Sequence, residues 1–157
     1  MFSPSRNEVR QFFCAVRQRQ RDGLPLSGME LLAADIVAAH PEYHALLDHP
    51  EAALEREWTP KSGSMNPFLH LSLHLAIAEQ LSIDQPVGIR ALFTYLRQNM
   101  EEHAAQHLLL ECLGEVLWIA QKEGASPDGG RYLAYIREAA ARVGKRATPL
   151  FPSEQGC

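Results

Sequence analysis

Six of the seven histidines in this sequence fall into three pairs of identical spacing. Each pair has the pattern HxxxH, and seven histidines placed at random would give about 0.3 such pairs. Residues four apart on an α-helix lie on the same side, about one turn apart, so each pair offers two imidazoles to one metal ion. The pairs are His40 with His44, His70 with His74, and His103 with His107.

The middle pair lies in a strongly apolar segment, NPFLHLSLHLAIAEQ, which spans residues 66–80. As a helix, this segment places its two histidines on one face with Ile77 and Leu81, while Ser72 and Glu79 lie elsewhere. A buried imidazole is costly unless its ring nitrogens find partners, and clustered imidazoles repel one another when protonated. A metal cation removes both problems, so the pattern predicts a metal site in the core.

The third pair begins an apolar helix that carries acidic residues on the same stripe. His103, His107 and Glu111 recur at intervals of four, so Glu111 would add a carboxylate to the imidazoles. We therefore expect three helices to direct histidines toward one site. The predicted core ligands are His44, His70, His74, His107 and Glu111, and the further candidates are His40 and His103.

A simpler explanation exists for each pair taken alone, because an isolated HxxxH is more often a surface pair or a hydrogen-bonded core pair. His103 follows two glutamates near a helix start, which favours a solvated side chain. In this simpler explanation, His40, which precedes Pro41, is only a helix cap. His49 fits an exposed turn, and it is the one histidine outside the pairs.

The metals that accept imidazole and carboxylate ligands are iron, zinc, nickel, copper and manganese, with iron and zinc favoured here. Six histidines and a glutamate exceed what one tetrahedral zinc needs, whereas a dinuclear non-haem iron site would use about that many ligands. The ligand types resemble those of hemerythrin-like bundles and differ from the Glu-x-x-His pairs of ferritin-like proteins. Whether the protein is an enzyme stays open: iron would suit an oxidoreductase, and zinc or nickel a hydrolase or a structural site.

The elements that must position these residues all have helical periodicity, and no segment alternates as a strand does. The sequence therefore predicts an all-α fold, a helical bundle of about five to seven helices. One domain is expected over residues 1–142, followed by a loosely ordered tail over residues 143–157. Helices are predicted within residues 3–23, 27–40, 67–82, 86–98, 101–124 and 131–144, with shorter ones within 41–48 and 49–58.

The composition is that of an ordinary globular protein, with 157 residues, 46% hydrophobic and 22% charged. A net charge of −4 gives no general argument for nucleic acid or an anionic membrane. Three cysteines without a CxxC motif favour a reducing cytosol; Cys112 is expected to pack in the core, and Cys14, off the apolar face of its helix, to lie at the surface. No apolar leader or membrane-spanning segment is evident, so a cytoplasmic protein without a membrane partner is expected.

An alternative function of a different class rests on four arginines near the start of the chain. They line one side of the first helix, and a solvated face is the favoured interpretation. The alternative is a non-catalytic interaction module that contacts RNA or a partner protein. These residues are Arg6, Arg10, Arg17 and Arg21, and the sequence does not indicate an oligomeric state.

Four strings of the sequence are specific enough to carry a resemblance: MFSPSRNEVRQFF, HPEYHALL, NPFLHLSLHLAIAEQLSIDQP and HAAQHLLLECLGEVLWIAQ. They resemble a bacterial family catalogued as domain of unknown function 1841. The resemblance covers roughly residues 1–138. It implies one domain in a bacterial cytosol and supplies no activity or catalytic residues.

Overall fold

The structure is a computed structural model that describes the backbone of residues 5–59 and 65–155, and the side chains as far as residue 144. Every regular element within these ranges is a helix, which confirms the predicted all-α fold. The chain divides into two compact units, Met1–Glu79 and Gln80–Cys157. The prediction of one domain over residues 1–142 stays a prediction.

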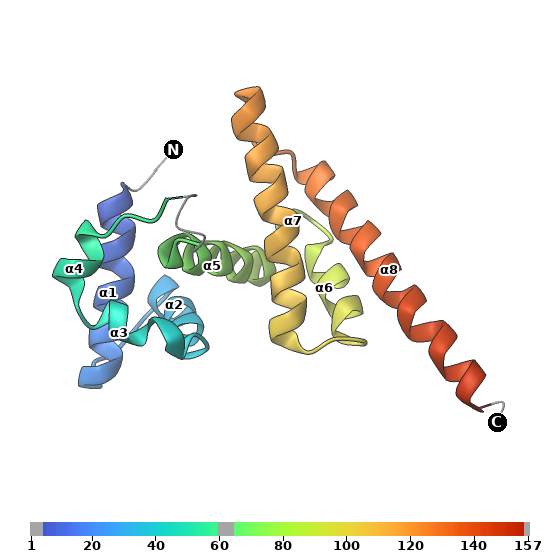
Figure 1. The fold of residues 1–157 in the computed structure, drawn as a ribbon, viewed down its shortest axis with the longest axis horizontal. Helices are drawn as coiled ribbons and strands as arrows, with labels where there is room; N and C mark the ends of the chain where they lie inside the picture. Colours follow the sequence, from blue (N-terminus) through green and yellow to red (C-terminus); the bar gives the residue numbers. More distant parts are fainter. Residues whose placement is uncertain (1–4, 60–64, 156–157) are drawn as a thin grey trace. The chain divides into compact units, whose positions relative to one another are not determined.

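The first unit contains the long helix α1, most of the equally long α5, and several short helices (Figure 1). Helix α1 packs against α2, α3 and α4, and α5 then carries the chain toward the second unit. The predicted loop around residues 59–67 falls largely on residues 60–64, which lie outside the described residues. The bounds are α1 (Arg6–Asp22), α2 (Met29–Ala38), the 3-10 helix η1 (Pro41–Tyr43), α3 (His44–Leu47), α4 (Pro50–Glu55) and α5 (Pro67–Ile83).

Helix α1 begins and ends at the residues that its sequence indicates. The Ser5 hydroxyl accepts a hydrogen bond from the backbone N–H of Glu8 at 3.2 Å, and Gly23 closes the helix with a φ of 65°. Ser27 and Glu30 have the spacing of a capping box at the start of α2, but Gly28 occupies the N-cap position. There the Glu30 carboxylate accepts from the backbone N–H of Ser27 at 3.3 Å, without the reciprocal hydroxyl bond.

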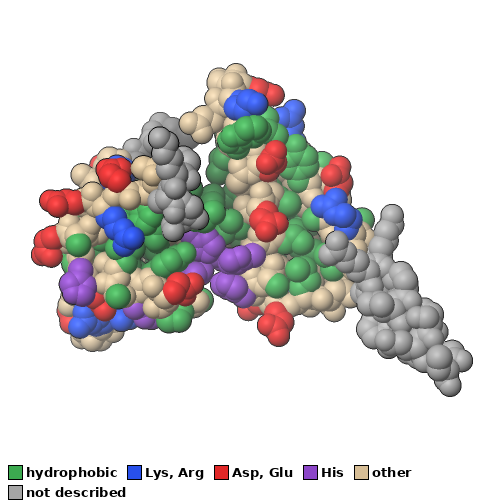
Figure 2. All heavy atoms as spheres, in the orientation of Figure 1, with side chains coloured by type: hydrophobic (Ala, Val, Ile, Leu, Met, Phe, Trp, Pro, Cys, Tyr) green, Lys and Arg blue, Asp and Glu red, His purple; other side chains and the backbone are tan. Residues whose placement is uncertain are grey.

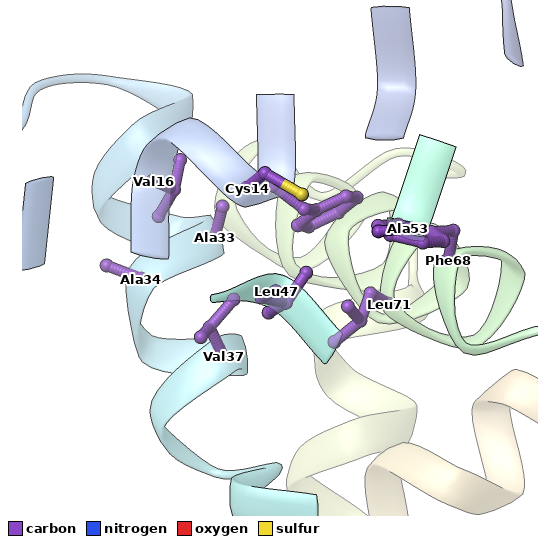
Figure 3. Packing of buried hydrophobic residues seen from close by; sticks show 10 residues of the cluster. Cys14, Val16, Ala33, Ala34, Val37, Leu47, Ala53, Phe68 and Leu71 are labelled. Atoms are coloured by element: carbon purple, nitrogen blue, oxygen red, sulfur yellow. The ribbon is translucent and has the colours of Figure 1, made fainter. Parts of the chain in front are cut away.

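The core of the first unit joins residues from all of its α-helices (Figure 3). Phe13 and Val16 on α1 meet Val37 on α2 and Leu71 on α5, each at most 1% exposed. Cys14 belongs to this core at 5% exposure, so the suggestion of a surface thiol was wrong. Burial raises the pKa of this thiol, with a smaller contribution from a nearby carboxylate.

Arg10 is a buried residue of α1, 2% exposed, that links this helix to the end of α4. Its Nη1 donates to the backbone carbonyls of Ala53, Leu54 and Arg56 at 2.9, 3.1 and 2.8 Å. These carbonyls lie where α4 ends, and helix ends leave carbonyls without intrahelical donors. The guanidinium also lies 5.0 Å from the ring centroid of Trp58.

The second unit contains α6 (Ile89–Arg97), α7 (Glu102–Glu123) and α8 (Gly129–Gln155), each in contact with the other two. Gly124 ends α7 with a φ of 64°, as its position in the sequence predicts. Helix α6 begins after Gly88, three residues beyond the Pro86 start suggested by the sequence. The backbone of α8 stays helical to Gln155, where the sequence predicts a loose tail, and the side chains beyond residue 144 lie outside the described set.

Within the part of the chain that the structure describes, no helix combines the length and apolar character needed to cross a lipid bilayer.

Candidate metal centre

Three histidines of the first unit form a triangle of imidazoles. The ring centroids of His40 and His70 are 5.1 Å apart, those of His40 and His74 are 4.7 Å apart, and those of His70 and His74 are 4.8 Å apart. The ring planes cross at 61–77°, so the rings meet edge to face and do not stack on one another. Each ring offers a nitrogen within 4.8 Å of a nitrogen on the other two.

Helix α5 supplies two of these histidines, His70 and His74, from consecutive turns. The Asn66 side chain accepts a hydrogen bond from the Phe68 N–H at 2.9 Å and so starts this helix at a defined point. His74 is 3% exposed and His70 is partly buried. The prediction that residues four apart lie on the same side of a helix is confirmed for this pair, because α5 is helical without a break from His70 to His74.

His40 comes from the end of α2, at the point where Pro41 stops the helix. Its side chain is 2% exposed, and Nδ1 donates to the backbone carbonyl of Ile36 at 2.7 Å. Because a carbonyl only accepts, this bond places a proton on Nδ1, so Nε2 is the nitrogen that a neutral ring would offer to a metal. An imidazole pinned in this way by a backbone carbonyl is the usual state of a metal-ligating histidine.

The ring of Tyr43 lies parallel to the ring of His40. The two rings are parallel within 2°, with centroids 5.7 Å apart. The one-turn helix η1 places Tyr43 there, since its N–H bonds the His40 carbonyl at 3.0 Å. The Tyr43 ring also lies 6.1 Å from that of His70, so this tyrosine borders the triangle. Burial raises the pKa of its phenol.

His49 repeats the local structure of His40 away from the triangle. It also precedes a proline that begins a helix, and its Nδ1 donates to the carbonyl four residues earlier, Ala45, at 2.8 Å. The backbone angles agree closely, with φ and ψ of −124° and 65° at His40 and −125° and 73° at His49. His49 is exposed, as predicted. The His-Pro turn thus explains the orientation of His40 but not its burial beside two further imidazoles.

Three imidazoles in this arrangement suit a transition-metal ion. Tetrahedral ligation at about 2.1 Å from each nitrogen brings ligand atoms about 3.4 Å apart. The nitrogens of His40, His70 and His74 lie within 4.8 Å of one another. To bind one ion they would have to approach one another by at most about 1.4 Å. Charge also favours an ion, since the cation stabilises the neutral form that each imidazole must keep when buried.

His44, a predicted core ligand, turns away from this triangle. Its Nε2 donates to the backbone carbonyl of Val37 at 2.8 Å. Pro41 is the reason: the chain leaves α2 after Ala38 and restarts as η1, so no continuous helix connects His40 with His44. The spacing argument that holds on α5 does not apply to a pair with a proline between its members.

The remaining candidates lie on α7 in the second unit. His103 and His107 are neighbours there, with ring centroids 4.4 Å apart. His103 is exposed, as its position near the helix start suggests, and His107 is partly buried. Glu111 is exposed and lines a hollow of about 330 Å³ together with Cys112 and other residues of α7 and α8. The roles of His103, His107 and Glu111 as ligands stay predictions.

The four arginines of α1 have partners inside the first unit. Arg6 pairs with Glu57 at 2.8 Å, and Arg17 and Arg21 reach Asp48 at 2.9 and 3.3 Å. The interpretation of a solvated arginine face was wrong for Arg10, which is buried. On the face that Figure 2 shows, basic and acidic side chains are interspersed. This arrangement adds no support for the alternative of an RNA-binding stripe.

Fold and histidine triangle together define a helical protein with a candidate transition-metal centre built from imidazoles. The chain belongs to the family described as Domain of unknown function (DUF1841), which matches residues 5–138 and confirms the resemblance read from the sequence. Searches of curated proteins and of solved structures gave no match. The bacterial and cytoplasmic setting stays a prediction.

Proposed function

We propose that the protein binds one divalent transition-metal ion through the imidazoles of His40, His70 and His74. The observation that carries the proposal is the triangle itself, in which three rings lie with centroids 4.7–5.1 Å apart. Two of the three imidazoles are at most 3% exposed. Burial of an imidazole has a free-energy cost, which binding of a shared metal ion would offset. The Nδ1 bond of His40 to a backbone carbonyl adds the expected support behind a ligand.

We propose one metal ion and not the dinuclear iron centre that six candidate histidines and Glu111 suggested from the sequence. Dinuclear iron sites in bundles depend on carboxylates, and the described first unit contributes only histidines to this cluster. An all-imidazole set suits zinc first, then iron(II) and nickel, whereas manganese prefers oxygen ligands. Zinc is therefore the ion with which the proposal is best tested, with iron(II) as the second.

The fourth ligand in this proposal is His107, chosen from the sequence because it repeats the HxxxH pattern of the other two pairs. Four imidazoles would close the coordination shell, so that the ion chiefly adds its binding free energy to that of folding. Three protein ligands and one water would instead give an open site that can activate water for hydrolysis. Replacing His107 separates these two forms of the same function.

The proposal is tested by metal analysis of protein purified without an affinity tag and without chelators. We expect about one equivalent of metal per chain by plasma mass spectrometry, and a loss of most of it in His70→Ala and in His74→Ala. His49→Ala is the matched control, because His49 makes the same backbone bond as His40 and is exposed. Less than about a tenth of an equivalent after anaerobic loading with zinc and iron(II) would refute the proposal.

A further inference from the structure

A cavity of about 570 Å³ lies in the first unit, apart from the residues of the histidine triangle. Its walls come from α1, from the first residue of α2 and from α5. The volume falls in the range of pockets that hold small organic ligands, roughly 300–1,000 Å³. Nothing in the proposed metal site uses this cavity.

The walls of the cavity are mainly hydrocarbon. Val9 and Phe12 from α1 and Leu75 from α5 pack against the core with one side and line the cavity with the other. Met29 stands at the rim with 39% of its surface exposed, and methionine side chains adapt readily to ligands of different shape. An apolar molecule entering this space would remove these surfaces from water.

The polar groups of the lining are few and of one sign. The Ser72 hydroxyl donates to the Phe68 carbonyl at 2.6 Å and is thus used within α5. The other two are the carboxylates of Glu8 and Glu79. The Glu8 carboxylate accepts a hydrogen bond from the Ser5 hydroxyl at 3.1 Å. Among the described lining residues there is no lysine, arginine or histidine.

We propose that this cavity binds an amphipathic monocation, a molecule with a hydrocarbon or aromatic body and one ammonium group. The body would occupy the space between Phe12 and Leu75, and the ammonium would lie beside Glu8 or Glu79 at the rim. Charge complementarity selects this class: a fatty acid of the same length would place its carboxylate beside two others, and a neutral alcohol would gain no ion pair. The inference is independent of the metal site.

The test measures binding of three probes with the same eight-carbon chain to the full-length protein by isothermal titration calorimetry. They are n-octylamine, which is protonated at pH 7, n-octanoate and octan-1-ol. We expect the amine to bind at least about tenfold more tightly than the alcohol at low salt, and the octanoate most weakly. Equal affinities for the amine and the octanoate would overturn the proposal, as would no heat from any probe at millimolar concentration.

Variants separate the acidic rim from the apolar walls. The double change Glu8→Gln with Glu79→Gln should bring the amine within about twofold of the alcohol while leaving alcohol binding unchanged. Ala76→Phe should fill the cavity and weaken binding of the amine at least about tenfold. If Ala76→Phe does not fold, Met29→Trp at the exposed rim serves the same purpose. Amine binding unaffected by the filling variant that folds would overturn the proposal.

A second copy of the chain is the competing occupant of an apolar cavity. Sedimentation velocity across a hundredfold concentration range tests it directly. We expect no change in mass that depends on Ala76 or Met29. Self-association that is abolished by the filling variant and competed by the alcohol as well as the amine would replace the proposed ligand by a protein interface.

Discussion

The imidazole of His40 lies 4.7 Å, centroid to centroid, from that of His74, although His40 lies just beyond the end of α2 and His74 lies within α5. Both side chains are almost fully buried, at 2% and 3% exposure. A contact of this kind between two titratable rings has a free-energy cost unless both stay neutral, since two protonated rings would repel at short range. The predictions on the histidines test whether a metal ion is what these rings bind together.

His74→Ala compared with Leu73→Ala distinguishes ligation from packing. Leu73 is also buried, at 8% exposure, one position earlier on α5. If His74 is a ligand, its loss should lower the melting temperature mainly in the metal-loaded protein, because binding adds to folding free energy only when metal is present. Leu73→Ala should destabilise both forms by roughly 2–5 kcal/mol. Calorimetry with and without a chelator measures this.

Equal destabilisation of the metal-free and metal-loaded protein by His74→Ala, with metal occupancy unchanged, would make His74 a hydrogen-bonded core residue.

His107→Ala tests the fourth ligand with cobalt(II) as a spectroscopic substitute for zinc. With four imidazoles, the variant should lose one nitrogen ligand, change the visible d–d bands and weaken metal binding at least about tenfold. Unchanged bands and affinity would show that water, and not His107, completes the shell. His103→Ala, at the exposed member of the same pair, is the control.

Asp48→Asn should reduce stability in a pH-dependent way. The hydrogen bond from Arg17, at 2.9 Å, holds the pKa of the Asp48 carboxyl below its usual value of 3.8. A lowered folded pKa stabilises the protein above the unfolded pKa, and this stability is lost as pH falls through the folded pKa. We expect a loss of about 1 kcal/mol at pH 7 that vanishes near pH 2, measured by urea unfolding. A loss of the same size at both pH values would contradict the ion-pair origin.

Arg10→Met should destabilise the first unit by about 3 kcal/mol, because three carbonyls at the end of α4 lose their donor in a buried place. Arg10→Lys should be intermediate, since an ammonium can donate to carbonyls but cannot stack flat beside Trp58. Urea midpoints measure both variants. A change below about 0.5 kcal/mol for Arg10→Met would show that these hydrogen bonds contribute little.

Cys112 should alkylate slowly although it is only partly buried. Burial, together with the nearby carboxylates of Glu111 and Glu138, raises the pKa of this thiol to about 11. Because the thiolate is the reacting form, its fraction at pH 8 falls roughly 100-fold below that of a thiol with a pKa near 9. Iodoacetamide labelling with peptide mass spectrometry should show this delay. Labelling at the rate of free cysteine would contradict it.

The sequence by itself determined the local part of this protein. Ser5, Gly23 and Gly124 end helices where their types predict, because capping needs only neighbouring backbone groups. His70 and His74 face the same side because a continuous helix repeats every 3.6 residues. The all-α fold followed from the same periodicity.

The tertiary structure decided which side chains are covered and which distant residues meet. His40 belongs with α5 because α2 packs its end there, and His44 does not because Pro41 interrupts the helix between them. Arg10 shares a helix face with exposed arginines, yet it is buried because the end of α4 lies over it and needs a donor. The helical period sets where a side chain points, and only the packing of segments remote in sequence determines what lies there.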